Sequence, residues 1–286
     1  MTRLAVPKTY KLFIGGAFPR SESGRSYEVL AADGSFLANA AQASRKDARD
    51  AVVAARKAVP GWSGATAYNR GQVLYRVAEM LEGRREQFAE EVRASEGLPK
   101  QDAVRQVDDA IDTWVWYAGW ADKFAQVAGN ANPVAGPFFN LSVPEPTGVV
   151  AAIAPQGGLS LLGLVAVVAP AIVSGNAVVV VADERHPLSA ISLAEVLATS
   201  DVPGGVVNVL TGSPAEIAPW LASHADVNAI DLTGASDLDW VDLQIAAADT
   251  LKRVLPPTGG EVDTRSLGRI AALTETKTVW HTKSML

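Results

Sequence analysis

The side chains that could carry out covalent or metal chemistry are few in this sequence. It contains no cysteine, which excludes disulfides, thiolate metal sites and a cysteine nucleophile. Its three histidines, His186, His224 and His281, have no second ligand at the spacing of a metal site. Glu145 and Glu184 are the acidic residues near the cleft expected below. The sequence therefore predicts no catalytic residue, no metal site and surface positions for the histidines.

A phosphate-binding loop is absent in its common forms, because neither GxGxxG nor GxxxxGK[ST] occurs in the chain. The nearest candidate is residues 233–236, TGAS, which follow a predicted strand and are expected to open a helix. The N–H groups at such a helix start would face an anion. Asp237 and Asp239 would then lie in the first turn, where acidic side chains are favoured.

Residues 145–187 give the clearest prediction of the fold that positions these side chains. Residues 149–154 are a short apolar run that predicts a buried strand. Residues 159–174 are apolar on every face, which predicts a buried helix. Residues 177–181 are a second strand-like run. Strand, helix and strand make one βαβ unit, whose two strands are parallel.

The same alternation continues towards the C-terminus. Helices and strands are predicted in turn at residues 189–199, 206–210, 215–222, 227–232 and 237–255. This pattern predicts an α/β fold with a Rossmann-like, doubly wound parallel sheet. In such sheets the ligand lies across the carboxyl ends of the strands. The residues expected at those ends are Pro155, Glu184, Gly212, Thr233 and Gly234.

The N-terminal part is expected to begin with hairpins and to add a helical layer. Residues 12–36 carry three turn signals and predict short hairpins. Ser44 and Asp47 predict a capped helix start, and that helix is expected to end near residue 59, before Pro60.

Two longer helices are predicted at residues 68–94 and 101–127. In the second, Trp116, Trp120 and Phe124 are four residues apart and share one stripe. Such a stripe is either a ligand platform or packing, and packing is favoured because buried aromatic side chains contribute large areas to a core.

Two segments predict a small β extension. Residues 129–138 are rich in turn residues, and residues 138–143 alternate apolar and polar side chains like an exposed strand. After a polar linker at 258–266, residues 273–282 have the look of one last strand.

The bulk composition is that of a globular protein of 286 residues, with 48% hydrophobic and 20% charged residues. The net charge of −6 argues against a nucleic-acid partner. Residues 157–175 are membrane-like in composition, but a buried helix between two strands explains them better. Residues 1–11 show no secretory signal, so a cytoplasmic location and no membrane contact are expected.

Four segments resemble the cofactor-binding domain of the aldehyde dehydrogenase superfamily, in this order and spacing. They are EPTGVVAAIAP at 145–155, APAIVSGNAVVV at 169–180, DVPGGVVNVLTG at 201–212 and IDLTGAS at 230–236. The resemblance implies NAD or NADP as the cofactor. It implies seven cofactor contacts: Ile153, Pro155, Glu184, Gly212, Thr233, Gly234 and Ser236.

The sequence departs from that family at its working positions. The family uses a cysteine thiolate, an oxyanion-holding asparagine, a ribose-binding lysine and a glutamate that activates water. The asparagine position falls on Gly157, the lysine position on Val181 and the glutamate position on Pro257, while Ala235 replaces a serine. These changes predict no catalysis and a degraded cofactor site. Restoring lysine at 181 and serine at 235 is expected to strengthen cofactor binding.

The resemblance also implies an internal deletion, because LTETKTVW at 273–280 resembles the family's C-terminal strand. Residues 1–128 and 145–257 would form the NAD(P)-binding domain. Residues 129–144 and 267–286 would form an oligomerisation ribbon and C-terminal strand, and the catalytic domain would be absent.

Three functions are compatible with this reading. The first is an inactive homologue that assembles, as a homo- or hetero-oligomer, with a full-length aldehyde dehydrogenase and supports or regulates it. The second is an oxidoreductase acting on aldehydes with NAD(P). The third is a nucleotide-binding sensor. The missing cysteine favours the first over the second, and Val181 and Ala235 weigh against the third.

Overall fold

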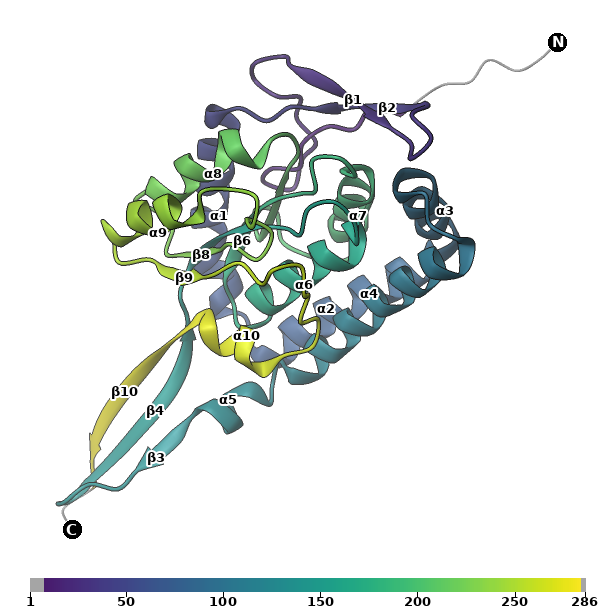
Figure 1. Cartoon of the computed structure of the whole chain (residues 1–286). Helices are drawn as coiled ribbons and strands as arrows, with labels where there is room; N and C mark the ends of the chain where they lie inside the picture. The colour runs from purple at the N-terminus through teal and green to yellow at the C-terminus, as the bar shows by residue number, and fades with distance from the viewer. Residues whose placement is uncertain (1–7, 284–286) are drawn as a thin grey trace.

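The centre of the molecule is a five-stranded parallel sheet with the order β7-β6-β5-β8-β9 (Figure 1). The computed structural model describes residues 8–283. The ends of the predicted domains at residues 1 and 286, and most of the segment 1–11 in which no secretory signal is expected, lie outside the described residues. The strands are β5 (Val149–Ile153), β6 (Ala177–Val181), β7 (Val207–Leu210), β8 (Ala229–Asp231) and β9 (Arg253–Leu255). The predicted α/β, doubly wound architecture is confirmed.

Helices cover both faces of this sheet, because alternate side chains of its buried strands point to opposite sides. Val150 and Val178 pack into a core with the N-terminal helices and with the helices between β5 and β7, while Val149 and Val179 pack into the other core. The first core holds α2 (Ala67–Glu82), α3 (Arg85–Glu96), α4 (Lys100–Trp120), α6 (Ser160–Val173) and α7 (Leu188–Ala198). The second holds α1 (Arg45–Gly64), α8 (Pro214–Ser223) and α9 (Trp240–Ala248).

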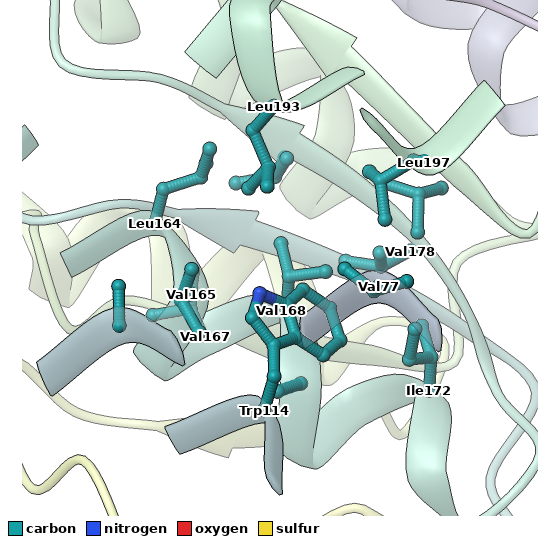
Figure 2. Packing of buried hydrophobic residues seen from close by; sticks show 14 of the residues in the cluster. Val77, Trp114, Leu164, Val165, Val167, Val168, Ile172, Val178, Leu193 and Leu197 are labelled. Carbon is teal, nitrogen blue, oxygen red and sulfur yellow. The ribbon is translucent and has the colours of Figure 1, made fainter. Parts of the chain in front are cut away.

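α6 is buried along its whole length, as its apolar sequence predicts. Figure 2 shows its Val165 and Val168 beside Trp114 of α4 and Val77 of α2. The predicted helical layer therefore lies outside α6 and shields it from water. Within residues 8–283 no helix combines the length and apolarity needed to cross a bilayer.

The predicted aromatic stripe at residues 116, 120 and 124 belongs to this packing. Trp116 and Trp120 are partly buried against the core, with ring centroids 5.8 Å apart, and Phe124 is buried. The interpretation as packing is confirmed.

The predicted capping box at the start of α1 is confirmed. Ser44 Oγ accepts the N–H of Asp47 at 3.3 Å, and the Asp47 carboxylate accepts the N–H of Ser44 at 2.8 Å. The predicted end of this helix is wrong, because α1 continues through Pro60. The last turn is held in place by Trp62, whose buried indole N–H donates to the carbonyl of Ile172 at 2.8 Å.

Both long N-terminal helices predicted from the sequence are divided. A turn at Gly83 and Arg84 separates α2 from α3, which redirects α3 so that Phe88 and Val92 reach the core. A turn at residues 121–123 separates α4 from the short α5 (Phe124–Ala128), which leads the chain into the β extension.

The predicted helix at residues 237–255 is also wrong. α9 covers only its middle, and the chain then turns at Leu251, which adopts a left-handed conformation with φ 54°. The N–H of Lys252 bonds back to Ala247, and the N–H of Arg253 bonds to Asn228. The segment after the turn becomes β9, the fifth strand.

Two smaller sheets complete the fold. The predicted N-terminal hairpin is β1 (Ser26–Leu30) with β2 (Phe36–Ala41). The β extension pairs β3 (Asn130–Asn132), β4 (Phe138–Pro146) and β10 (Thr274–Thr282), in the order β10-β4-β3. In Figure 1 these three strands project away from the body of the molecule.

The short α10 (Leu267–Ala272), which the sequence analysis did not predict, joins the linker to β10. Ile270 and Leu273 are fully buried in the core that surrounds α6. Asn176, which follows α6, donates from Nδ2 to the carbonyl of Leu273 at 2.9 Å. The segment after the linker is therefore an integral part of the fold.

Candidate functional site

The strand order places a ligand crevice at one point of the sheet. From β5 the chain winds outwards through β6 and β7, and then returns to the other side of β5 with β8 and β9. The loops after β5 and β8 therefore leave in opposite directions. In open α/β sheets this reversal marks the place where ligands bind.

Two adjoining cavities lie at this point, and we call them together the switch-point cleft. One, of about 190 Å³, is lined by the loops after β5, β6 and β7 and by the segment from 234 to 238. The other, of about 400 Å³, is lined by the loops after β5 and β8 and by linker residues between Thr258 and Val262. Their shared wall consists of Gln156, Gly157, Gly234 and Asp237.

Five of the seven predicted cofactor contacts line this cleft: Pro155, Glu184, Thr233, Gly234 and Ser236. The structure does not bring the other two there. Ile153 is fully buried inside β5, and its carbonyl accepts the N–H of Gly234 at 3.0 Å. Gly212 lies against Gln42 and Ala43, where the chain enters α1.

The turn after β5 is bound by a buried carboxylate that the sequence analysis missed. Asp183, in the loop after β6, accepts the N–H groups of Gly157 at 2.8 Å and Gly158 at 3.1 Å. It also accepts the N–H groups of Arg185 at 2.8 Å and His186 at 3.2 Å. The side chain of Asp183 is only 1% exposed. The Asp183 carboxylate therefore already accepts the N–H groups of Gly157 and Gly158, which would otherwise be available to a bound anion.

The N–H groups at the start of α6 are likewise satisfied by side chains, which come from the N-terminal helices α3 and α4. Glu96 of α3 accepts the N–H groups of Leu159 at 3.0 Å and Ser160 at 2.9 Å. Gln106 of α4 accepts the N–H of Leu161 at 3.1 Å. The donors at this helix start are consequently satisfied by the chain's own side chains.

The turn after β8 does not form the predicted phosphate cradle, because α9 begins only at Trp240, capped by Asp239. The N–H of Thr233 donates to Asp231 at 3.0 Å, that of Gly234 to the β5 carbonyl described above, and that of Ala235 to a backbone carbonyl at 2.8 Å. The prediction that TGAS opens a helix is wrong.

A buried ion pair between Arg269 and Asp231 fixes the turn after β8 on its core side. The Arg269 guanidinium of α10 pairs with Asp231, and its Nη1 also donates to Thr233 Oγ1 at 3.2 Å. Asp231 is fully buried and accepts Thr233 Oγ1 at 2.6 Å as well. The element after the linker thus determines the position of one wall of the cleft.

The two cofactor-side replacements are sealed from the cleft. Val181 and Ala235 are both fully buried, with 0% accessible surface, and they belong to the same apolar cluster. A lysine at 181 would have to bury its ammonium in that cluster, at a large cost. The expectation that Val181→Lys and Ala235→Ser would strengthen binding is therefore not supported by the geometry.

These features do not fit the pyrophosphate of a dinucleotide. Asp183, Glu184 and Asp237 line the cleft against a single cation, Arg185, so the surroundings are acidic. The N–H groups of Gly157, Gly158, Thr233, Gly234 and Ala235 already have partners. An anion at this place would face like charges, and most N–H groups of the two turns would not be available to it.

His186 is not the surface histidine that was predicted. Its side chain is 16% exposed, and its Nδ1 lies 3.1 Å from the Asp183 carboxylate. This hydrogen bond raises the pKa of His186, against the opposing effect of burial. Burial disfavours the charged form of Asp183, but His186 and the backbone N–H groups outweigh it and lower the Asp183 pKa. Among residues 8–283 no cluster of three metal-ligating side chains forms.

The second candidate site is the projecting ribbon of β4 and β10. Phe139, Leu141 and Val143 alternate along β4 and are 55%, 43% and 39% exposed. Of their partners in β10, Val279 opposite Leu141 is apolar, whereas Lys277 and His281 are polar. One face of the ribbon therefore carries an apolar stripe along β4 that continues into β10 at Val279. We call it the apolar ribbon face.

The ribbon also offers an edge. β10 pairs with β4 along all nine of its residues, but no strand within residues 8–283 pairs with its other side. Unpaired edges of this length invite another strand. In the described part of the chain only the three-residue β3 pairs with the other edge of β4, so this projecting sheet has little to stabilise it on its own.

The comparisons with known proteins agree with this fold. A family model described as "Aldehyde dehydrogenase family" matches residues 18–264. The chain belongs to this family.

Individual relatives give the same result. Retinal dehydrogenase 2 of Gallus gallus is 34% identical over 259 residues, which cover 89% of this chain and 49% of that protein. Cytosolic 10-formyltetrahydrofolate dehydrogenase of Mus musculus is 32% identical over 267 residues, covering 91% of this chain and 29% of that protein. The structure of an NAD+ complex of aldehyde dehydrogenase from Bacillus cereus matches with a TM-score of 0.79 and 26% identity, over 86% of this chain and 50% of that one. This aldehyde dehydrogenase family chain thus spans about half or less of the relatives that it matches.

Proposed function

We propose that this chain is a non-catalytic member of the aldehyde dehydrogenase family that assembles with an active relative and supports or regulates it. The observation that carries the proposal is the ribbon, which presents an apolar face and an open edge although the chain has no cysteine nucleophile. An exposed face of this kind is typical of a surface that another protein covers.

The proposal assigns residues 1–128 and 145–257 to a cofactor-type domain, and residues 129–144 and 267–286 to the assembly ribbon. Residues 256–273 connect β9 to β10 directly and include Pro257 at the position of the family's glutamate. The catalytic domain of the full-length relatives would have been lost between these strands. We place the protein in the cytoplasm with its partner.

The cleft supports the non-catalytic assignment. It offers acidic side chains and satisfied N–H groups, and Gly157 cannot supply an oxyanion donor from a side chain. Removal of one such donor typically lowers a rate by about 10²–10³. An assembly role requires no chemistry in this cleft, whereas the oxidoreductase alternative does.

The isolated chain is expected to oxidise no aldehyde. Purified protein would be incubated with a panel of aldehydes and with NAD or NADP, while the absorbance of the reduced nicotinamide is followed. We expect no increase above a heat-killed control, because the nucleophile and its base are missing.

Turnover that disappears when Asp237 is changed to alanine would contradict the proposal and favour an oxidoreductase. Calorimetry with NAD on the same sample separates the third alternative. A micromolar dissociation constant without turnover, weakened by Glu184→Gln in the cleft, would favour a nucleotide sensor that uses the cleft.

A further inference from the structure

A third cavity lies away from the switch-point cleft, in the groove between α1 and α8. Its volume of about 580 Å³ falls in the range of about 300–1,000 Å³ that is usual for small-molecule sites. Its walls come from the first turns of α1, from the end of α8 and from Glu22. It shares no lining residue with the cleft.

Arg45 and Trp220 form the most specific feature of this cavity. The Arg45 guanidinium lies over the Trp220 ring, 3.6 Å from the ring centroid. Among residues 8–283 Arg45 makes no ion pair, unlike the neighbouring Lys46 and Arg49, which contact Glu22 at 3.2 Å and Asp50 at 2.7 Å. A stacked guanidinium keeps its N–H groups in plane and available for a bidentate acceptor.

The charge of the cavity is opposite to that of the protein. Arg45, Lys46 and Arg49 line it together with one carboxylate, Glu22, and Asp50 pairs with Arg49 beside it, which leaves an excess of one positive charge on Arg45. The chain as a whole carries −6. Trp220 is 41% exposed, so this residue is partly open to solvent beside these cations.

We propose that this cavity binds a phosphate-bearing small molecule with a planar ring, of the size of a nucleoside monophosphate. The phosphate would accept the free N–H groups of Arg45, with Lys46 and Arg49 as further cations. The planar ring would stack on the open part of Trp220. The negative charge of a phosphate would complement the positive charge of Arg45, the cation of this lining that has no ion pair within residues 8–283. This site is independent of the proposed assembly role.

The test is a calorimetric titration of the full chain with adenosine monophosphate at low ionic strength. We expect saturable binding, weakened at least about tenfold by Arg45→Gln and also by Trp220→Leu. Arg45→Lys keeps the charge without the planar fork, and an intermediate loss is expected. Adenosine and inorganic phosphate, each with half of the recognised chemistry, should bind at least about tenfold more weakly than the nucleotide. Far-ultraviolet circular dichroism of each variant confirms that it is folded.

A matched control in the cleft separates the two sites. Glu184→Gln changes a cleft carboxylate and should leave nucleotide binding unchanged. The proposal is overturned if the wild-type chain shows no saturable binding, if Arg45→Gln binds as well as wild type, or if adenosine alone binds equally well. Loss of binding on Glu184→Gln but not on Arg45→Gln would place the nucleotide in the cleft, which also overturns it.

Discussion

Replacing Arg269 with alanine is expected to lower the free energy of unfolding by about 3–5 kcal/mol, the usual cost of leaving a buried charge without its partner. Asp231 is fully buried, and the Arg269 guanidinium is its only cationic partner within residues 8–283. Thr233 would lose a hydrogen-bond donor in the same change. Urea denaturation of wild type and variant measures the difference.

Arg265→Ala is the matched control for this prediction. Arg265 lies four residues earlier and pairs with Asp112 at 3.2 Å and Asp109 at 3.9 Å, but all three side chains are exposed. Its loss should cost less than about 1 kcal/mol. The double variant Arg269→Met/Asp231→Leu should recover part of the loss, because no buried charge remains. An Arg269→Ala protein as stable as the Arg265→Ala protein would show that the C-terminal segment does not anchor β8.

Replacing Asp183 with alanine is expected to destabilise the protein by about 2–4 kcal/mol, since hydrogen bonds to a charged group contribute about 1.5–3 kcal/mol and its donors would be left without an acceptor. The variant should also gain a property that wild type lacks. With the carboxylate removed, the N–H groups of Gly157 and Gly158 become available to an added anion. Inorganic phosphate at about ten times its dissociation constant would restore about 1.4 kcal/mol.

Glu184→Ala is the control, because this neighbouring carboxylate is exposed and lines the same cleft. It should change stability by less than about 0.5 kcal/mol and should show no phosphate effect. If phosphate stabilises wild type and Asp183→Ala equally, the turn after β5 is not closed by Asp183.

The stability difference between wild type and Asp183→Ala should depend on pH, because the pKa values of His186 and Asp183 are both shifted. The folded-state pKa of His186 is raised, so its contribution is complete below the unfolded value of about 6.5 and is lost as the pH rises through the folded value. The folded-state pKa of Asp183 is lowered, so its contribution is present above about 3.9 and is lost as the pH falls through the folded value. The stability difference between wild type and Asp183→Ala should therefore be largest between about pH 4 and 6.5.

Local patterns were sufficient to predict much of the scaffold. The run from β5 through α6 to β6 consists of uniformly apolar segments, and uniform apolarity in a globular chain requires burial. The Ser44 capping box depends only on residues three apart, and it formed as predicted. The alternation in residues 138–143 likewise predicted an exposed strand, which the structure extends to Pro146.

The interactions that close the cleft were beyond this reasoning because they join distant residues. Glu96 is 63 residues from Leu159, and Arg269 is 38 residues from Asp231. No periodicity relates such pairs. Asp183 had a local signal, since an aspartate in a turn often accepts the N–H two residues later, as it does from Arg185. β9 was missed because a single left-handed residue, Leu251, interrupts a segment with helical composition.

The assembly role is tested most directly by the mass of the complex, measured by light scattering after mixing this chain with full-length aldehyde dehydrogenases from the same cell. Wild type should form a species heavier than either component with at least one of them. Leu141→Glu places a charge on the apolar ribbon face and should remain at 30.0 kDa, the mass of one chain. Leu30→Glu, at a similarly exposed apolar position in β1, should assemble like wild type. A wild-type chain that stays at 30.0 kDa in every mixture, or a Leu141→Glu chain that assembles as well as wild type, would contradict the assignment of the ribbon as the assembly surface.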